Sequence, residues 1–465
     1  MTARRRDAWT WAIVAVVVAG AAVRFATLDV QSMWLDEAVT HSLVTRSFGA
    51  MLSAIPHSES TPPLYYVLEW AWARVFGSGA VGLRSLSALY GTATIVVLAA
   101  VAGRLGGRRA ALAAAALAAA NPLLIWYSQE ARAYALLVLL CALTVWCLVR
   151  GDWRGWALAA ALALATHYFA VFVVIPELLW LAWRHARRSR PAALSIAFVV
   201  VVGAALLPLA VKQASADRAR FIKSSALGSR ASAIVKQFLV GYATPHATVL
   251  TIVAVLAAAG IATGLRFADR GQAALAAIAV GVPLALALLG IDYVITRNLI
   301  AAMVPLVVLA AVAASRTRAG PVLVASLCAA GIVAFVGVET TPADQRDDWR
   351  GVAAAIGTPT ARPRYIVVDP SDGPPALELY LPLRRVPGSN GTLLQAREVD
   401  VIDVARDPPV PGVSAAMAGF TPSVIHTDTY TVVRYIAPTP TLIYYSHLAA
   451  AALLARAGSS ILTDR

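Results

Sequence analysis

Long apolar runs recur along most of this sequence and constrain its fold more than any other feature. A run of about 18 or more mostly apolar residues can cross the ~30 Å hydrocarbon core of a bilayer as a helix. Apolar residues make up 59% of the 465 residues and charged residues only 14%, a balance that soluble globular domains do not show. The sequence therefore predicts a polytopic α-helical membrane protein.

About eleven spans can be placed on the chain by length and hydropathy. The apolar run over 153–183 is too long for one crossing, and the polar pair Thr166 and His167 interrupts it, so we divide it there. The expected spans are 9–27, 81–103, 109–126, 131–149, 154–166, 168–184, 191–211, 247–265, 271–291, 297–315 and 320–338.

The basic residues predict the orientation of these spans. A net charge of +14 would suit a nucleic-acid-binding protein, but the arginines gather in alternate connections, as the positive-inside rule describes, so no nucleic-acid partner is expected. This pattern places the N-terminus in the cytoplasm, with the first apolar run retained as a helix. Arginine outnumbers lysine and alanine is abundant, a bias typical of a GC-rich bacterial genome, so we expect a multi-pass protein of the bacterial plasma membrane.

Two domains are expected. The transmembrane domain covers 1–338 and includes a first outer loop, 28–80, in which apolar residues at helical spacing predict helices lying on the membrane surface. Another amphipathic helix is expected at 229–240. After residue 339 the long apolar runs end, which predicts a small extracytoplasmic α/β domain over 339–465. Its expected elements are helices at 348–357 and 375–381 and strands at 363–370 and 429–438, too few strands to name a topology.

The stretch "QSMWLDEAVTHS" places two consecutive carboxylates, Asp36 and Glu37, just after the first span. On a helix they point about 100° apart, so one can act as a base while the other supports it. Alternatively, both only solvate a helix start or bind nearby arginines, which is the commoner role for a surface acid pair.

Glu59 stands before a double proline in "HSESTPPLYYVLEW". Prolines fix the local backbone and suit the start of a helix, and rigid placement is what a catalytic or binding carboxylate requires. Tyr65 and Tyr66 follow directly, and they either anchor the chain at the membrane surface or line a site.

The second outward turn lies in "NPLLIWYSQEARAYALL", residues 121–137. On a helix Glu130 and Tyr134 share one face, while Arg132 shares another with Ser128. Ionisable residues at this depth are costly and usually face a cavity or a partner. Arg132 is therefore either a ligand-binding residue or one half of a local pair with Asp36 or Glu59.

Later outward turns carry His167 with Tyr168, and then Arg297. A lone histidine at a membrane edge is usually structural, and Arg297 either anchors its span or clamps an anion. All of these turns open on the same side, so we expect one outer cavity. The residues expected to line it are Trp34, Tyr65, Tyr66, Glu130, Tyr134, His167 and Tyr168. No motif for nucleotide binding, zinc hydrolysis or redox chemistry is present.

Four segments in this order, "WLDEAVT", "TPPLYY", "WYSQEARAY" and "DWRGVAAAI", resemble the bacterial polytopic glycosyltransferases of the GT-C class. That class is similar to protein O-mannosyltransferases and lipid A aminoarabinose transferases. The resemblance implies inverting transfer of a sugar, a hexose or a pentose, from a polyprenyl-phosphate donor to an acceptor on the outer side of the plasma membrane. It matches Asp36 and Glu37 to the acid pair of the family and Glu59 to the acid before the double proline.

The chemistry of such a transfer assigns the candidate roles. The leaving group is a phosphate, so it needs positive charge from arginine or a divalent metal ion, and no general acid. Arg132 and Arg297 could supply bidentate contacts. The acceptor, a cell-envelope glycan, lipid or protein, must lose a proton, and we expect Asp36 to take it, supported by Glu37 and Glu59. The donor tail would remain in membrane lipid.

Two other classes of protein remain open. A multi-spanning transporter or lipid flippase would use Glu130 and Arg132 as substrate or proton sites. A membrane scaffold whose outer domain binds envelope polymers would not need Asp36 at all. The clustering of polar residues on one side favours the enzyme over both.

Overall fold

The computed structural model describes residues 2–187, 189–267, 269–369, 373–388, 391–404, 417–451 and 460–465. The chain forms two compact units: unit 1 comprises Met1–Leu28 and Leu43–Gly337, and unit 2 comprises Asp29–Ser42 and Val338–Arg465. We expected the whole of 28–80 to belong with the transmembrane spans. Asp29–Ser42 instead joins the C-terminal unit, because Ala38 is buried in the core of that unit and Trp34 packs against it.

Helices coincide with every expected span. They are α1 (Thr2–Phe25), α5 (Ala80–Gly106), α6 (Arg108–Ala120), α7 (Pro122–Ser128), α8 (Tyr134–Arg150), α9 (Trp153–Thr166), α10 (Val171–Leu181), α11 (Arg190–Ala214), α13 (Ala247–Ala262), α14 (Arg270–Leu288), α15 (Met303–Ser315) and α16 (Gly320–Thr340). Within the described ranges, seven helices are long and apolar enough to cross a bilayer alone, and α6 with α7 forms a bent pair. The chain is thus a multi-pass membrane protein, while the number of eleven crossings stays a prediction.

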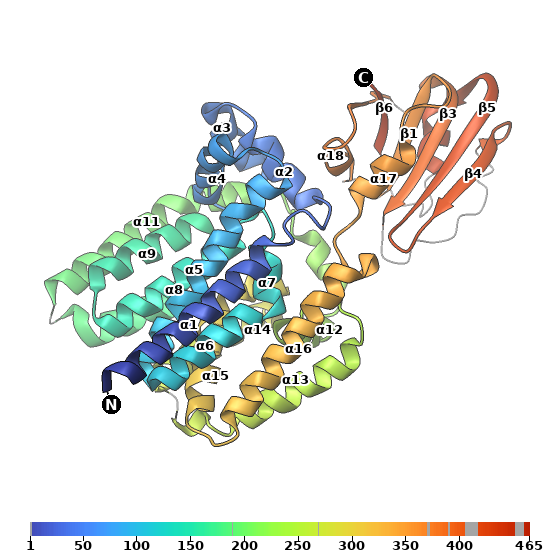
Figure 1. The fold of residues 1–465 in the computed structure, drawn as a ribbon. Coiled ribbons are helices and arrows are strands. Elements are labelled where there is room, and N and C mark those ends of the chain that lie inside the picture. Colours follow the sequence, from blue (N-terminus) through green and yellow to red (C-terminus); the bar gives the residue numbers. More distant parts are fainter. Residues whose placement is uncertain are drawn as a thin grey trace. The chain divides into compact units, whose positions relative to one another are not determined.

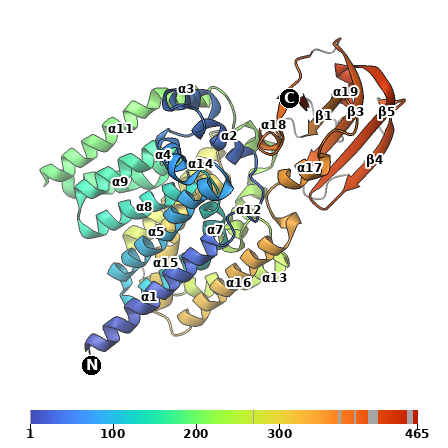
Figure 2. The ribbon, with the colours of Figure 1, turned by 45° about the horizontal axis from the view of Figure 1, so that its top comes forward.

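Helices are also present where the sequence predicted amphipathic ones between the spans. These are α3 (Phe48–Ser58), α4 (Leu64–Phe76) and α12 (Leu227–Val240). Short helical turns η1 (Tyr168–Ala170) and η5 (Thr296–Ala302) open the segments that lead into α10 and α15. In both views α8, α9 and α11 lie side by side, and α5 packs against α6 and α8 (Figures 1 and 2).

A break between α6 and α7 redirects the chain by 61°. Asn121 caps α7 by accepting the Leu124 N–H at 3.0 Å, and Pro122 occupies the first position, where its missing N–H costs nothing. The Asn121 amide also donates to the Phe238 carbonyl at 2.8 Å. The short α7 therefore ends in the turn 129–133, which presents Glu130 and Arg132.

Arg24 of α1 stabilises this break by bonding residues on both sides of it. Its guanidinium is fully buried and donates to Ser128 Oγ at 3.1 Å and to the carbonyls of Gly20, Ala118 and Ala119 at 3.0, 2.9 and 3.2 Å. The last two acceptors are end carbonyls of α6, where a cation also meets the negative end of the helix dipole. Gly91 of α5 makes room for this contact, because a Cβ there would lie 1.9 Å from Ser128 Oγ.

Unit 2 is built on one six-stranded sheet in the order β2-β6-β1-β3-β5-β4, in which β1 and β3 are parallel and the other pairs antiparallel. The strands are β1 (Arg364–Asp369), β2 (Leu383–Arg385), β3 (Leu393–Val404), β4 (Thr421–His426), β5 (Tyr430–Tyr444) and β6 (Ser460–Asp464). Both faces are covered, since Ile366 and Val368 of β1 enter one core cluster and Val367 enters the other.

Short helices complete unit 2. They are α2 (Leu35–Val44), most of which belongs to this unit, α17 (Trp349–Ile356), α18 (Pro374–Leu377) and α19 (Tyr445–Ala450). The expected helix at 348–357 and the expected strands at 363–370 and 429–438 are confirmed. The expected helix at 375–381 is only the single turn α18, because Leu383–Arg385 already belongs to a strand.

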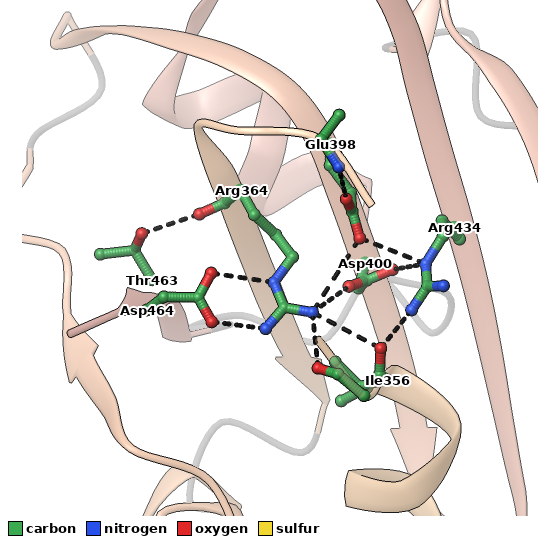
Figure 3. Close-up of polar contacts among 9 residues, drawn as sticks. Ile356, Arg364, Glu398, Asp400, Arg434, Thr463 and Asp464 are labelled. Atoms are coloured by element: carbon green, nitrogen blue, oxygen red, sulfur yellow. Dashed lines mark hydrogen bonds and ion pairs between the residues drawn. The ribbon is translucent and has the colours of Figure 1, made fainter. Parts of the chain in front are cut away.

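A buried charge network links β1, β3, β5 and β6 (Figure 3). Arg364 donates through Nε to Asp464 at 3.0 Å and lies 3.6 Å from Asp400. Arg434 donates to Asp400 at 2.8 Å and lies 3.3 Å from Glu398. Two guanidinium groups thus serve three carboxylates, and burial raises the pKa of Asp400 to about 6, although Arg434 opposes the shift.

This shift predicts the direction of a pH effect on stability. The pKa of Asp400 is higher in the folded than in the unfolded chain, so the folded state binds the extra proton and stability rises as pH falls from 7.5 to 5, by about 1.4 kcal/mol from this group. Thermal unfolding of the detergent-solubilised protein at both pH values, compared with Asp400→Asn, isolates this contribution. An identical pH dependence in the two proteins would rule it out.

Candidate functional site

The site in unit 1 is organised around a buried ion pair. Arg132 donates through both terminal nitrogens to the carboxylate of Glu59, at 2.9 and 3.0 Å, and the Glu59 side chain is 2% exposed. The guanidinium carbon also lies 5.9 Å from the centre of the Tyr66 ring. The expected local pairing of Arg132 with Glu59 is present in the structure. A bidentate pair of this kind is strong and directional.

The backbone around Glu59 explains its placement. Glu59 ends α3 with an extended conformation, and its N–H bonds the Ile55 carbonyl at 3.0 Å. Pro62 and Pro63 follow at the start of α4, so the turn cannot continue as a helix. Arg218, from the segment after α11, donates to the Glu59 carbonyl at 3.0 Å. The carboxylate is therefore carried by a turn that is held at both ends.

The turn that carries Arg132 is tied to α1. The Gln129 side chain donates to Thr27 Oγ1 at 2.6 Å and to the carbonyls of Val23 and Arg24 at 3.2 and 3.3 Å. Two acceptors on α1 and a third just after its end fix the position of this turn relative to α1. Glu130, the residue after Gln129 in this turn, is 1% exposed.

His167 lies at the end of α9, where the charges of Arg132 and Arg297 both act on its ring. Burial first, and then the charges of Arg132 and Arg297, lower the pKa of His167 to about 3. Its Nδ1 accepts the Phe169 N–H at 3.2 Å, so the proton of the neutral ring is on Nε2. The neutral ring therefore offers an uncharged donor, and the rings of Phe169 and Tyr134 lie 5.2 and 5.6 Å from it.

Arg297 is the second residue of η5, and the loop before η5 sets its position. Arg230 donates to Asp292 at 2.9 Å and to the Val294 carbonyl at 2.7 Å, and its hydrogen bonds hold the pKa of Asp292 below the usual value. The guanidinium carbon of Arg297 lies 5.5 Å from the centre of the Phe221 ring. Asp292 is thus a structural partner that fixes the entry to η5.

A cluster of tyrosines, Tyr127, Tyr134 and Tyr242, lies beside the turn that carries Arg132. The Tyr127 and Tyr134 rings are 4.6 Å apart, and the hydroxyls of Tyr127 and Tyr242 are in contact. Burial raises the pKa of Tyr242, the charge of Glu130 adds to this, and Arg297 opposes it. Tyr127 and Tyr242 were not among the expected residues. The aromatic "GYATPH" after the amphipathic helix was the available signal for Tyr242.

The other expected pocket residues of unit 1 are Tyr65 and Tyr168. Tyr65 is buried, and its ring meets that of Tyr66 edge-on at 5.4 Å. The Tyr168 hydroxyl donates to the side chain of Gln213 at 2.7 Å. Tyr65 thus contacts Tyr66, whose ring lies near Arg132, and Tyr168 contacts Gln213, which bonds the Thr61 carbonyl.

Trp34, Asp36 and Glu37 belong to unit 2. Glu37 is fully buried and accepts the Trp34 N–H at 3.4 Å, which is half of a capping box at the start of α2. Asp36 lies in the first turn of α2 and is partly exposed. Of the two carboxylates, Asp36 is the more exposed, and Glu37 bonds the start of the helix.

Within the described part of the chain, no three His, Cys, Asp or Glu side chains gather as a protein metal site requires. Arg132 and Arg297 both bring positive charge near His167.

Comparisons with known proteins support one fold. Residues 60–212 match the family model described as dolichyl-phosphate-mannose-protein mannosyltransferase. The chain is similar to the crystal structure of ArnT from Cupriavidus metallidurans in the apo state, with a TM-score of 0.58 and 16% identity over 96% of this chain and 99% of that one. This chain has the GT-C glycosyltransferase fold. A second ArnT structure, bound to undecaprenyl phosphate, matches the GT-C fold of this chain with a TM-score of 0.54 and 16% identity over 93% and 99% of the two chains. No curated protein matches by sequence.

The ion pair predicts a strong energetic coupling. Replacing Glu59 or Arg132 by glutamine leaves one charge buried without its partner, so each single variant should lose about 3 kcal/mol of unfolding free energy. The double variant should lose much less than the sum. Reversible unfolding in mixed micelles measures all four proteins, with Arg150→Gln at the far end of α8 as the control. Additive losses would contradict the coupling.

Proposed function

We propose that this protein transfers a sugar from a polyprenyl-phosphate donor to an acceptor hydroxyl at the outer face of the bacterial plasma membrane, with inversion at the anomeric carbon. The observation that carries the proposal is the placement of Arg132, paired with Glu59, and of Arg297 near the buried His167, whose pKa both arginines lower. The GT-C fold and the ArnT structure bound to undecaprenyl phosphate support the class of donor. The positive-inside pattern supports an outward-facing site and an extracytoplasmic C-terminal domain.

We expect the protein to recognise the donor mainly through its phosphate group. Arg132 already gives its two terminal nitrogens to Glu59, so we expect Arg297 to make the larger contribution to phosphate binding. The Nε2–H of His167 adds an uncharged donor that does not depend on pH in the physiological range. Positive charge at this position stabilises the phosphate as it leaves with the electron pair of the broken bond.

The lipid tail has a suitable place in unit 1. A cavity of about 210 Å³ lies among α6, α12, α13, α15 and α16, and its walls are almost wholly apolar. It is lined by Leu117, Asn121, Phe238, Leu239, Ala258, Ile261, Met303, Leu306, Val307, Ala310, Leu327 and Cys328. An isoprenoid segment would bury apolar surface there, while the phosphate stays at the outward turns.

Asp36 is assigned as the base. The acceptor oxygen attacks the anomeric carbon as the bond to the phosphate oxygen breaks, and its proton passes to the Asp36 carboxylate. A single displacement of this kind inverts the anomeric carbon and needs one carboxylate, unlike glycoside hydrolysis with retention. Either a hexose or a pentose satisfies this chemistry, and so does a glycan, lipid or protein hydroxyl.

A lipid flippase or transporter is the second candidate, and one observation favours it. Glu177 of α10 is buried among spanning helices, where it accepts the Trp156 indole N–H at 2.9 Å and the Thr144 hydroxyl at 3.0 Å. Buried carboxylates in spans often mark transport pathways. Here both oxygens are satisfied by neighbouring helices, which equally suits a structural role.

Sugar transfer by the purified protein in nanodiscs tests the proposal. Radiolabelled polyprenyl-phosphate sugars and a cell-envelope extract serve as donor and acceptor. Wild type should label the extract, and Asp36→Ala and Asp36→Asn should transfer at least about 100-fold more slowly, because the base is lost. Asp29→Asn is the matched control, since Asp29 is an exposed acid of the same segment that pairs with Arg350 at 2.9 Å.

Two outcomes would overturn the proposal. One is wild-type protein that transfers no sugar with any donor of this class. The other is transfer by both Asp36 variants at the wild-type rate, which would remove Asp36 from the mechanism. Movement of labelled lipid across vesicle membranes without transfer would favour the flippase.

A further inference from the structure

Gln213 is a buried polar residue near the end of an otherwise apolar helix. It is 3% exposed, whereas its neighbours Lys212 and Ala214 are exposed to the surroundings of α11. Burying an amide is costly unless its donors and its acceptor are all engaged. The contacts of this side chain therefore indicate why a glutamine lies here.

The amide bridges three segments of unit 1. Its nitrogen donates to the carbonyls of Ile55 and Thr61, at 3.3 and 3.1 Å, and its oxygen accepts the Tyr168 hydroxyl at 2.7 Å. Both N–H groups and the carbonyl oxygen are thus satisfied. The two carbonyls lie on either side of Glu59, so one side chain spans the turn that carries this carboxylate.

The two carbonyls differ in what else they bind. The Ile55 carbonyl already accepts the Glu59 N–H at 3.0 Å, so the Gln213 amide is its second donor, whereas Thr61 precedes two prolines, whose nitrogens carry no hydrogen. Tyr168 directly follows His167 at the start of η1. The amide therefore ties the Glu59 turn to the segment that holds the imidazole.

We infer that Gln213 is a positioning residue, which with the Tyr168 hydroxyl sets the placement of Glu59 relative to Arg132 and His167. Its effect on sugar transfer rests on the proposed function, whereas its effect on the ion pair does not. Arg218, five residues later, reinforces the same turn by donating to the Glu59 carbonyl at 3.0 Å. The end of α11 and the segment after it thus both hold the turn that carries Glu59.

Three variants separate positioning from general stability. Gln213→Met keeps the length of the side chain but removes all three hydrogen bonds. Gln213→Glu keeps an acceptor for Tyr168 but loses both donors, and Tyr168→Phe removes only the third bond. Ser215→Ala is the control, because the Ser215 hydroxyl bonds only the carbonyl of Lys212 in its own helix.

The first measurement needs no activity. The coupling between Glu59 and Arg132, obtained from the double-mutant cycle, should fall by at least half in the Gln213→Met background and stay unchanged in the Ser215→Ala background. Unchanged coupling in a folded Gln213→Met protein would overturn the inference. If Gln213→Met does not fold, the same cycle in the Gln213→Glu and Tyr168→Phe backgrounds decides the question by the same criterion.

The second measurement uses sugar transfer. Misplacement of the site should lower kcat by about 10- to 100-fold in Gln213→Met, with a change of less than about threefold in KM for the donor. Gln213→Glu should resemble it, and Tyr168→Phe should show a smaller loss. Wild-type kinetics in all three variants would overturn the positioning role. If wild type itself transfers nothing, the proposed function fails, while the coupling measurement still tests Gln213.

Discussion

The arrangement of unit 1 depends on keeping the charges of Glu59 and Arg132 together and away from water. Removing a carboxylate and a guanidinium from water is costly, and a bidentate geometry offsets this cost only if both backbones are held firmly. The surrounding structure supplies this rigidity. The double proline ends α3 on one side, and on the other the break at Asn121 and the anchoring of Gln129 on α1 place the turn that carries Arg132.

A second buried guanidinium, that of Arg24, supports the turn that carries Arg132, because it bonds Ser128 at the end of α7. Arg24 is bonded to four neutral oxygens of α1, α6 and α7, so its charge is spread over helix-end carbonyls and a hydroxyl. Arg132 and Arg297 add two further guanidinium groups to the turns of unit 1, and Glu59 offsets the charge of Arg132. Unit 2 follows a different pattern, because in the network around Arg364 carboxylates outnumber the guanidinium groups.

The sequence predicted the positions of the apolar helices well, because hydropathy and helix length are local properties that do not depend on distant residues. It also identified Glu59, Arg132, His167 and Arg297 as candidates, since ionisable residues at membrane turns are unusual. It left the partner of Arg132 open between Asp36 and Glu59, because that choice depends on how distant turns meet. The sheet of unit 2 was largely missed, since a strand such as "EVDVIDV" buries its acids beside arginines that are remote in sequence. The roles of Gln213 and Tyr242 were hidden for the same reason.

The central claim is that the site recognises the phosphate of a polyprenyl donor mainly through Arg297. Native mass spectrometry of the purified protein with undecaprenyl phosphate and with undecaprenol tests it most directly, because the two lipids differ only in the phosphate. We predict that wild type retains undecaprenyl phosphate at least about 10-fold better than undecaprenol, and that Arg297→Gln removes this preference while leaving undecaprenol binding unchanged. Equal retention of the two lipids by wild type, or a full preference in Arg297→Gln, would contradict the account.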